Sequence, residues 1–567
     1  MTRAFRTLAT CFVITWVALG IPALRSVPIA AQTSPQAQPA SNKKTLMVAM
    51  RDGTKLATDI YLPEGDGPFP VILLRTPYNK NMGAGIGAAG TQRGYAVVIQ
   101  DTRGRFASEG QNFPFEGDGW WENRWDGYDT VEWIAAQPWC NGKIGTMGGS
   151  ALGITQLLLA GTGTSRLACQ QIHVGAPSGY HDLAFTGGTL RKAMVETWLT
   201  ATNHHPDSLK RWVSHPTYDS YWRERDLTHR FKRVNVPALH LGGWYDIFCQ
   251  GTIDAFNGYQ RQGGPKARGR QKLLMGPWTH GIFQDRTGEL TFPNAKHPPN
   301  HVDDMWRWFD HYLKGADTGI EKEAAVTYYV MGDITDPSAP GKEWRTADCW
   351  PPPGAKMTPF YFHDDLTLSK AKPSAKGKPI TFTYDPKNPV PTCGGPQLTL
   401  KAGALDQRPI ESRPDVLVFT SEPLAQPLEV TGRVRVELWA SSDCPDTDFV
   451  VKLCDVYPDG RSMNVCEGIL RARFREGFDK EKLLEPGKPY RFRIDLWSTS
   501  IVFNRGHRLR VQVTSSNAPG WDPNPNTGAP FRADDKTQVA RNTVYLDGKR
   551  PSHILLPVMT GKSTANR

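Results

Sequence analysis

The sequence lacks the short motifs that usually identify metal sites and nucleic-acid-binding surfaces. Its nine cysteines include no Cys-x-x-Cys pair and its fourteen histidines include no His-Glu-x-x-His motif, so we expect no structural or catalytic metal. The net charge is +11, but lysine and arginine are scattered along the chain, which argues against a nucleic-acid partner. We also expect no other cofactor.

The chain contains no long segment poor enough in apolar residues to be disordered. Hydrophobic residues make up 39% of its 567 residues and aromatic residues 10%. Because a single core rarely grows past about 250–300 residues, we expect two or three domains. The 18 tryptophans indicate large cores and an aromatic lining of a pocket.

The N-terminal segment has the pattern of an export signal. Arg3 and Arg6 precede an apolar run from Leu8 to Leu24, and small residues at 29–31 suit cleavage after Ala31. The pattern predicts a signal peptide over 1–31 and a flexible leader over 32–44, rich in Pro, Ala, Ser and Gln. The mature protein would be periplasmic or secreted, without stable membrane insertion. A retained membrane anchor is the alternative, because the run approaches the minimum spanning length.

Eight cysteines remain once Cys11 is removed with the predicted signal peptide. An oxidising compartment allows disulfides, and four of these cysteines share the C-terminal β region: Cys393, Cys444, Cys454 and Cys466. Their connectivity cannot be read from the spacing.

Strand and helix patterns alternate over 45–178 and return over 236–325. Val71–Leu74 and Tyr95–Gln100 are continuous apolar runs, as in parallel strands covered on both faces. Asp129–Glu132 has a capping-box pattern that indicates the start of a helix. This alternation predicts an α/β core in two parts.

Two further segments depart from this alternation. Residues 179–235 are helical in period and rich in Trp, His and Tyr, which predicts a helical cap inserted into the core. From 326 to 567 the period becomes two, as in Arg433–Trp439 and Arg508–Val513. Short strands punctuated by Pro and Gly predict a C-terminal β-sandwich of jelly-roll type.

A glycine-crowded turn holds a single serine between a strand and a helix. Gly148 and Gly149 precede Ser150, and small neighbours suit a nucleophile held in a strained backbone conformation. The usual second glycine, two positions after the serine, is replaced by Leu152, and Gly153 follows. A glycine-rich turn with an incidental serine is the alternative.

An aspartate and a histidine follow later strands. Asp246 comes after the strand Ala238–Leu241 and can accept the Nδ1–H of a histidine, which fixes the tautomer. His280 follows the strand Lys272–Met275 and suits a general base toward the serine. Serine, aspartate and histidine in this order, each on a strand-ending loop, are typical of the α/β-hydrolase fold.

Acyl transfer also needs donors for an oxyanion. The backbone N–H of Ala151, directly after the nucleophile, is one candidate. Tyr78 follows the strand Val71–Leu74, and its phenol is a candidate for the second. On the residues alone, Tyr78 could equally be a packing aromatic.

Several motifs in combination resemble the cocaine esterase family, which is allied to the X-prolyl dipeptidyl aminopeptidases and the α-amino-acid ester hydrolases. In the first half these are Arg75–Tyr78, Gln100–Gly110, Gly148–Gln156, Gly243–Asp246 and Gly276–His280. In the C-terminal part they are Asp446–Phe449, Tyr457–Arg461 and Asn524–Gly528. The resemblance runs from about Lys44 to Pro557.

This resemblance implies an α/β-hydrolase core, a helical cap and a jelly-roll domain, with the active site where the three meet. It implies a triad of Ser150, Asp246 and His280. It also implies that Tyr78 supplies the oxyanion hydroxyl and Ala151 the oxyanion amide.

The sequence departs from the family pattern at the acyl-binding side. Family members usually have tyrosine at the position of Ala151, so the wall there is more open. The α-amino-acid ester hydrolases place acidic residues after the triad aspartate, whereas Ile247–Gln250 contains none. Trp244 and Phe248 instead predict an apolar or aromatic acyl group. Acidic residues of the cap, such as Glu196 or Asp207, are another source of a charge.

These observations predict a serine hydrolase that cleaves carboxylic esters, or amides, of small molecules through an acyl-enzyme. The alternatives are an X-prolyl dipeptidyl aminopeptidase, an α-amino-acid ester hydrolase or acylase, and a carbohydrate-binding protein. The sequence leaves open whether the chain forms a homo-oligomer.

Overall fold

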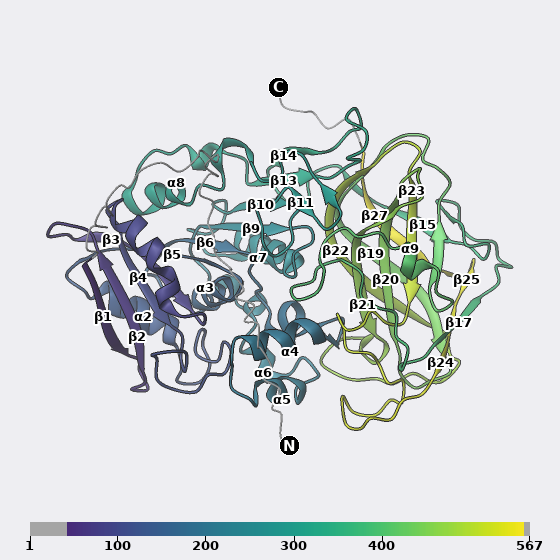
Figure 1. The fold of residues 1–567 in the computed structure, drawn as a ribbon, viewed down its shortest axis with the longest axis horizontal. Coiled ribbons are helices and arrows are strands. Elements are labelled where there is room, and N and C mark those ends of the chain that lie inside the picture. Colours follow the sequence, from purple (N-terminus) through teal and green to yellow (C-terminus); the bar gives the residue numbers. More distant parts are fainter. Residues whose placement is uncertain (1–41, 561–567) are drawn as a thin grey trace, which may run out of the picture. The chain divides into compact units, whose positions relative to one another are not determined.

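A computed structural model describes residues 42–560 (Figure 1). The predicted signal peptide and nearly all of the predicted leader lie outside these residues, so the cleavage site is not among them. Asn42–Ala49, at the end of that leader, forms the first strand, β1.

Ten strands form one sheet in the order β1-β2-β4-β3-β5-β6-β9-β10-β13-β14. After β1 they span Lys55–Leu62 (β2), Phe69–Thr76 (β3), Ala96–Asp101 (β4), Cys140–Gly149 (β5), Leu167–His173 (β6), Ala238–Gly243 (β9), Lys272–Gly276 (β10), Val326–Val330 (β13) and Glu343–Ala347 (β14). The seven strands from β4 to β13 in this order pair in parallel. Their carboxyl ends therefore meet at one edge, where open α/β sheets bind ligands.

Helices cover the sheet and extend from it. Those packed in the α/β part span Ala84–Thr91 (α1), Asp126–Ala135 (α2), Ala151–Gly161 (α3), Cys249–Gln262 (α7) and Met305–Phe309 (α8). The cap lies between β6 and β9 and contains Lys192–Ala201 (α4), Ser208–Val213 (α5) and Ser220–Arg223 (α6). Figure 1 shows these three short helices gathered beside the sheet.

The helix expected from the capping-box pattern begins earlier than predicted. α2 starts at Asp126 rather than at Asp129. The Asp129 carboxylate accepts hydrogen bonds from Arg51, including one of 2.6 Å from Nη2. The side chain that the local pattern assigned to the helix cap, Asp129, therefore forms a long-range ion pair with Arg51 instead.

The sheet of the α/β part extends past the domain boundary predicted at 325/326. β13 pairs with β10, and β14 pairs with β13, so both belong to this sheet. β13 is buried at all five positions, unlike the later strand β19 (Leu428–Ser442), in which buried and more exposed positions alternate. The period of two is therefore a feature of the sandwich strands and not of β13.

The remaining described residues, up to 560, contain two larger antiparallel sheets. One contains Ala355–Phe362 (β15), Leu368–Ser369 (β16), Ile380–Tyr384 (β17), Leu428–Ser442 (β19), Tyr490–Phe503 (β22), Ala540–Val544 (β24) and His553–Met559 (β27). The other contains Leu417–Thr420 (β18), Asp448–Val456 (β20), Ser462–Arg471 (β21) and Arg508–Thr514 (β23). The alternating pattern of these strands places apolar side chains between the sheets.

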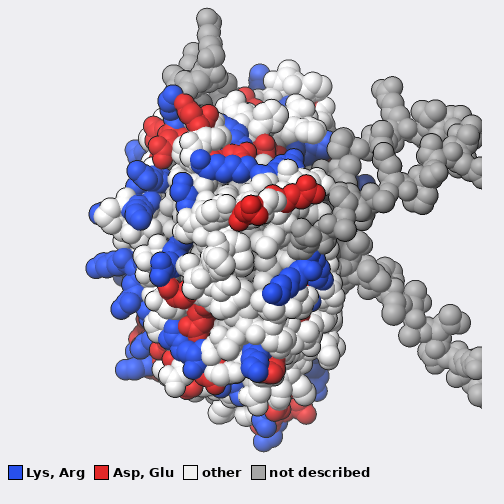
Figure 2. Space-filling model, turned by 90° about the vertical axis from the view of Figure 1, so that its left-hand side faces the viewer, with Lys and Arg blue, Asp and Glu red and all other residues white. Residues whose placement is uncertain are grey.

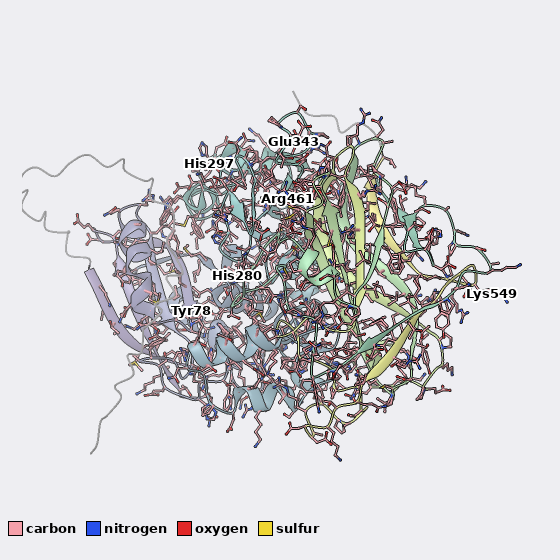
Figure 3. All side chains as sticks on the ribbon, turned by 45° about the vertical axis from the view of Figure 1, so that its right-hand side comes forward. Tyr78, His280, His297, Glu343, Arg461 and Lys549 are labelled. Atoms are coloured by element: carbon pink, nitrogen blue, oxygen red, sulfur yellow. The ribbon has the colours of Figure 1, made fainter. Side chains whose placement is uncertain are left out.

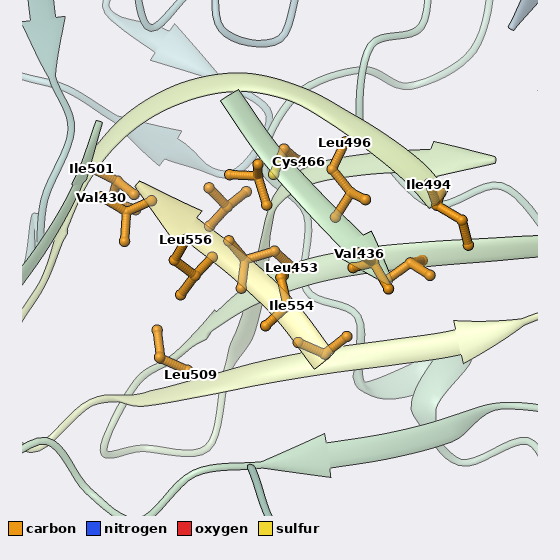
Figure 4. Close-up of a cluster of buried hydrophobic side chains, with 14 of the residues drawn as sticks. Val430, Val436, Leu453, Cys466, Ile494, Leu496, Ile501, Leu509, Ile554 and Leu556 are labelled. Atoms are coloured by element: carbon orange, nitrogen blue, oxygen red, sulfur yellow. The ribbon is translucent and has the colours of Figure 1, made fainter. Parts of the chain in front are cut away.

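Figure 4 shows this sandwich core, in which Val436 and Ile554 from the first sheet lie with Leu453 and Leu509 from the second. All four are fully buried. The core continues into the α/β part, because Trp244 and Tyr245 belong to the same buried cluster. The sandwich is thus joined to the α/β part through apolar packing.

The eight cysteines within residues 42–560 are free thiols. On the face shown in Figure 2, basic and acidic side chains are interspersed around an uncharged area. Within residues 42–560, no helix is long and apolar enough to cross a membrane.

Candidate active site

The backbone around Ser150 has the strained turn that the sequence predicts. β5 ends at Gly149, α3 begins at Ala151, and Ser150 between them has φ 59° and ψ −122°. A positive φ is uncommon for a residue with a side chain and occurs often at functional sites. At Gly148, which has φ +136°, an added Cβ would lie 2.5 Å from Leu152 Cβ, so the turn requires glycine there.

The glycine displaced by one position also has a packing role. A Cβ added to Gly153 would lie 2.8 Å from the carbonyl oxygen of His173, at the end of β6. The absence of a side chain at Gly153 therefore lets α3 pack closely on that strand. Leu152 takes the usual glycine position and remains half-buried.

Three predicted residues meet at the carboxyl edge of the sheet. His280 Nδ1 lies 2.6 Å from Asp246 Oδ1, and His280 Nε2 lies 2.9 Å from Ser150 Oγ. Because a carboxylate only accepts, Nδ1–H donates to Asp246 and Nε2 accepts from the serine hydroxyl. Asp246 is fully buried and His280 is 7% exposed, so the hydrogen bond between them is shielded from water, whereas Ser150 is half-buried.

Phe248 supports the same arrangement. Its backbone N–H donates to the second oxygen of Asp246 over 3.0 Å. Its ring packs edge-on against the His280 imidazole, with centroids 5.6 Å apart. Both carboxylate oxygens of Asp246 are therefore engaged, which fixes the plane of the carboxylate.

Tyr78 lies at the same edge, after β3. Figure 3 labels Tyr78 and His280, which both lie in the α/β part. The phenol oxygen accepts a hydrogen bond of 3.0 Å from Trp198 Nε1, and the Ser150 side chain is close enough to influence the pKa of the phenol. Burial raises the pKa of Tyr78, so the phenol stays protonated and can donate. Ala151 N–H is at the start of α3, where backbone donors are unpaired within the helix.

A cavity opens beside Ser150. Its lining is almost entirely apolar and comes from the α/β part, the cap and the sandwich: Phe115, Ser150, Ala151, Ile154, Leu183, Met194, Val195, Trp198, Trp212, Ile247, Phe248 and Leu398. No acidic residue is among them. Phe248, which the sequence predicts to contact the acyl group, is part of this lining.

Trp244 does not line this cavity, which corrects the prediction that it binds substrate. The indole is 4% exposed and donates from Nε1 to the Tyr329 carbonyl oxygen over 2.8 Å. It also stacks on Trp350, with ring centroids 5.3 Å apart. The turn after β9 directs Trp244 toward β13 and the sandwich, away from Ser150.

The acidic residues of the cap are engaged elsewhere. Glu196 pairs with Lys192 and with Arg532, and the Asp207 side chain is 66% exposed. The carboxyl of Asp182 is closer to the core and accepts from Ser178 N–H. Burial raises the pKa of Asp182 to about 8, so this group is largely uncharged at pH 7.

A buried arginine, which the sequence analysis missed, holds the loop after β9. Arg191 Nη1 donates to the carbonyl oxygens of Ile247 and Asp182. Burial lowers the pKa of Arg191 to about 10, so the guanidinium stays charged, and the nearby Asp246 carboxylate favours that charge. The cap thereby fixes the segment that carries Asp246 and Phe248.

No group of three or more His, Cys, Asp and Glu side chains within residues 42–560 is arranged to hold a metal ion.

Comparison with protein families gives two matches that cover different parts of the chain. The X-Pro dipeptidyl-peptidase (S15 family) matches residues 52–208 and 192–282. The X-Pro dipeptidyl-peptidase C-terminal non-catalytic domain matches residues 318–555.

Individual relatives match most of the chain. The cocaine esterase of Rhodococcus sp. (strain MB1 Bresler) is 34% identical, over 91% of this chain and 98% of that protein. An aminopeptidase from the marine sediment archaeon Thaumarchaeota archaeon has a TM-score of 0.78 at 27% identity, over 94% of this chain and 99% of that one. An α-amino acid ester hydrolase has a TM-score of 0.77 at 28% identity, over 93% and 100%.

These similarities confirm the resemblance found in the sequence and the predicted fold class. With a relative this similar over nearly the full length of both proteins, the chain belongs to the cocaine esterase family of α/β-hydrolases.

Proposed function

We propose that this protein is a serine carboxylic ester hydrolase in which Ser150, His280 and Asp246 form the catalytic triad. The observation that carries the proposal is the continuous hydrogen-bonded chain from Asp246 through His280 to Ser150 Oγ. It joins a nucleophile, a base and a group that orients the base.

In this proposal His280 Nε2 removes the Ser150 proton while Oγ attacks the ester carbonyl. The resulting oxyanion accepts hydrogen bonds from Ala151 N–H and from the Tyr78 hydroxyl. The tetrahedral intermediate collapses, and His280 gives its proton to the departing alcohol. Water, activated by the same histidine, then releases the acid from Ser150.

The cavity indicates the acyl groups that this site would accept. Its lining is apolar, and the nearby buried carboxyl of Asp182 is largely uncharged at pH 7. A bound α-ammonium group would lose its hydration without gaining a partner. We therefore propose that apolar or aromatic acyl groups are preferred.

Labelling by a fluorophosphonate probe, followed by mass spectrometry, tests the nucleophile. Ser150 should carry the adduct, and Ser150→Ala should abolish both labelling and ester turnover. Ser214→Ala is the matched control, because the Ser214 hydroxyl bonds only to the Arg211 carbonyl oxygen. Labelling that persists in Ser150→Ala would overturn the assignment.

A second candidate function is cleavage of X-prolyl dipeptides or α-amino-acid esters. It is favoured by the match to the S15 peptidase model and by the two solved relatives. Comparing aryl esters with X-Pro anilides on the purified protein separates the two activities. If the protein only bound carbohydrate and had no hydrolase activity, the probe would leave Ser150 unlabelled.

We also propose that the protein is exported and that residues 1–31 are removed. The support is the basic start, the apolar run and the small residues before Gln32. N-terminal sequencing of the protein from a periplasmic or culture-medium fraction should begin near Gln32. An intact N-terminus in a membrane fraction would favour the anchor instead.

A further inference from the structure

The hydroxyl of Tyr78 is held by a side chain from the cap. Trp198 lies on α4, 120 positions along the chain from Tyr78, and its Nε1–H donates to Tyr78 Oη over 3.0 Å. The hydrogen bond therefore joins the loop after β3 to an element inserted between β6 and β9.

The indole itself is fixed by aromatic neighbours. Phe115 stacks parallel to it, with centroids 5.9 Å apart and an angle of 1° between the planes. His204 packs at 4.7 Å and Trp212 at 6.4 Å. With rings on several sides, Trp198 has little room to rotate, so its N–H has a defined direction.

This hydrogen bond determines where the Tyr78 proton can point. An indole N–H only donates, so the phenol oxygen must be the acceptor in the pair. The O–H bond is then directed away from Trp198, and Ser150 is another side chain close enough to interact with the phenol. An oxygen that accepts one hydrogen bond also becomes a better donor in the next.

We infer that Trp198 is a positioning residue, which orients the Tyr78 hydroxyl toward the oxyanion formed on Ser150. The inference rests on the proposed role of Tyr78 in the oxyanion hole. Donors that are oriented before the reaction need no reorganisation when charge develops. The oxyanion hole is thus assembled from α3, from the loop after β3 and from the cap.

Trp198 has a second role that the experiment must separate from the first. With Phe115 it lines the apolar cavity beside Ser150 and also a neighbouring cavity that contains polar side chains such as Arg103 and His204. Truncating the indole would join these spaces and disturb substrate binding. A test of the hydrogen bond must therefore keep the ring.

The test replaces Trp198 by 3-benzothienylalanine, which keeps the bicyclic ring but has sulfur in place of the N–H. The replacement is made in the native protein and in Tyr78→Phe, and kcat and KM are measured for an aryl ester. Removing one neutral hydrogen bond should lower kcat about 3- to 15-fold with little change in KM for the benzothienyl variant. In Tyr78→Phe the same change should alter kcat less than about twofold, because the hydroxyl that it orients is gone.

A tetrahedral-adduct inhibitor gives an independent measurement. An aryl trifluoromethyl ketone, which places an oxyanion on the serine adduct, should bind the benzothienyl variant more weakly by about the factor lost in kcat. Trp212→Phe is the matched control, since Trp212 lines the same cavity and packs on Trp198 without a bond to Tyr78. Its effect should be the same with and without the Tyr78 hydroxyl.

Three outcomes would contradict the inference. Equal loss of kcat in both backgrounds would mean that Trp198 acts only through packing, and unchanged kcat in the native background would mean that the hydrogen bond has no effect on the reaction. If Tyr78→Phe itself leaves kcat unaltered, the oxyanion role of Tyr78 fails together with the inference. A normal effect of Tyr78→Phe with additive loss at Trp198 overturns the inference alone.

Discussion

Two buried histidines of this protein share one feature and differ in another. His280 and His507 each donate from Nδ1 to an aspartate, Asp246 over 2.6 Å and Asp455 over 2.8 Å. At the other nitrogen His280 meets the hydroxyl of Ser150, whereas His507 meets the carboxylate of Asp333 at 3.2 Å.

The partner at Nε2 decides what each imidazole can do. A hydroxyl can donate to a neutral ring, and a neutral ring can accept the proton of that hydroxyl during the reaction. Two carboxylates can only accept, so the ring between them is favoured as the imidazolium. Burial opposes that charge, but the carboxylates of Asp455 and Asp333 raise the pKa of His507.

The second histidine is therefore an ionic contact between the two parts of the chain. Asp333 follows β13 of the α/β sheet, Asp455 lies on β20 of the sandwich, and His507 precedes β23. Tyr457 covers the ring, with centroids 4.4 Å apart. We expect the group Asp333–His507–Asp455 to stabilise the junction. We expect the group Ser150–His280–Asp246 to take part in the reaction.

The largest expected effect separates the two histidines by activity. His280→Gln should lower kcat by about four to six orders of magnitude, because it removes the proposed base. His507→Gln should retain kcat within about threefold at a temperature where it is folded, since an ordinary site away from the chemistry shifts activity little. Steady-state kinetics on one aryl ester measures both, and strong loss in both variants would show that His507 is coupled to the reaction.

The next effect separates them by stability. His507→Gln leaves two buried carboxylates without their cation, so the free energy of unfolding should fall by roughly 3–5 kcal/mol. His280→Gln, next to an apolar cavity and a single carboxylate, should lose less. Urea unfolding monitored by tryptophan fluorescence compares the two, and equal losses would contradict the distinction.

Tyr78→Phe tests the proposed oxyanion donor beside Ser150. Deleting one oxyanion hydrogen bond should lower kcat about 10²–10³-fold, equivalent to roughly 2.7–4 kcal/mol. KM should change little, because this bond strengthens mainly in the transition state. Unaltered kcat, with chemistry shown to limit the rate, would mean that Tyr78 only packs.

The pH dependence of stability provides a further distinction. His507 has a raised pKa in the folded state, so its stabilisation is complete below its unfolded pKa and is lost as the pH rises through the folded value. Asp333 has a lowered pKa, since hydrogen bonds from Thr335 and Asn504 outweigh its burial. Its contribution is lost as the pH falls below its unfolded pKa.

The difference in the free energy of unfolding between the native protein and His507→Gln should therefore be largest at mildly acidic pH, about 5–6, and smaller at about pH 9. The measurement is the free energy of unfolding of both proteins across this range. A difference that grows toward alkaline pH would mean that the ring is neutral when folded.

The smallest expected effect concerns the acyl group. The matched pair is a phenylacetyl ester and the corresponding α-amino ester, phenylglycyl, at pH 7. We expect kcat/KM to favour the uncharged ester by at least about tenfold, or roughly 1.4 kcal/mol, because the ammonium would be desolvated without a partner. Equal or better hydrolysis of the amino ester would show that a charged carboxylate reaches the cavity.

Part of this architecture could be read from local pattern. The apolar runs of β3 and β4 and the glycines around Ser150 are short-range signals, and the order of Ser150, Asp246 and His280 specifies a known topology. Since each lies at the end of a parallel strand, pairing of those strands suffices to bring them to one edge.

Other features have no local signal. Trp244 and Trp198 are both tryptophans near predicted site elements, yet one packs beneath the sandwich and the other bonds to Tyr78. β13 and β14 directly precede the sandwich strands in the sequence, and only the pairing of β13 with β10 assigns them to the α/β sheet. Asp129 has the pattern of a helix cap, but its carboxylate binds Arg51, which is distant in sequence.

The sequence by itself determined the family, through the resemblance of its motifs, and it also determined the fold class and the three residues that meet at the carboxyl edge of the sheet. Strand periodicity and the strained turn at Ser150 could be predicted because neighbouring residues encode them. Only the tertiary structure decided which cap side chain orients Tyr78, where Trp244 packs and which carboxylates enclose His507. These depend on contacts between segments separated by 50 to more than 170 positions. Their geometry is set by how the elements pack, which no local pattern specifies.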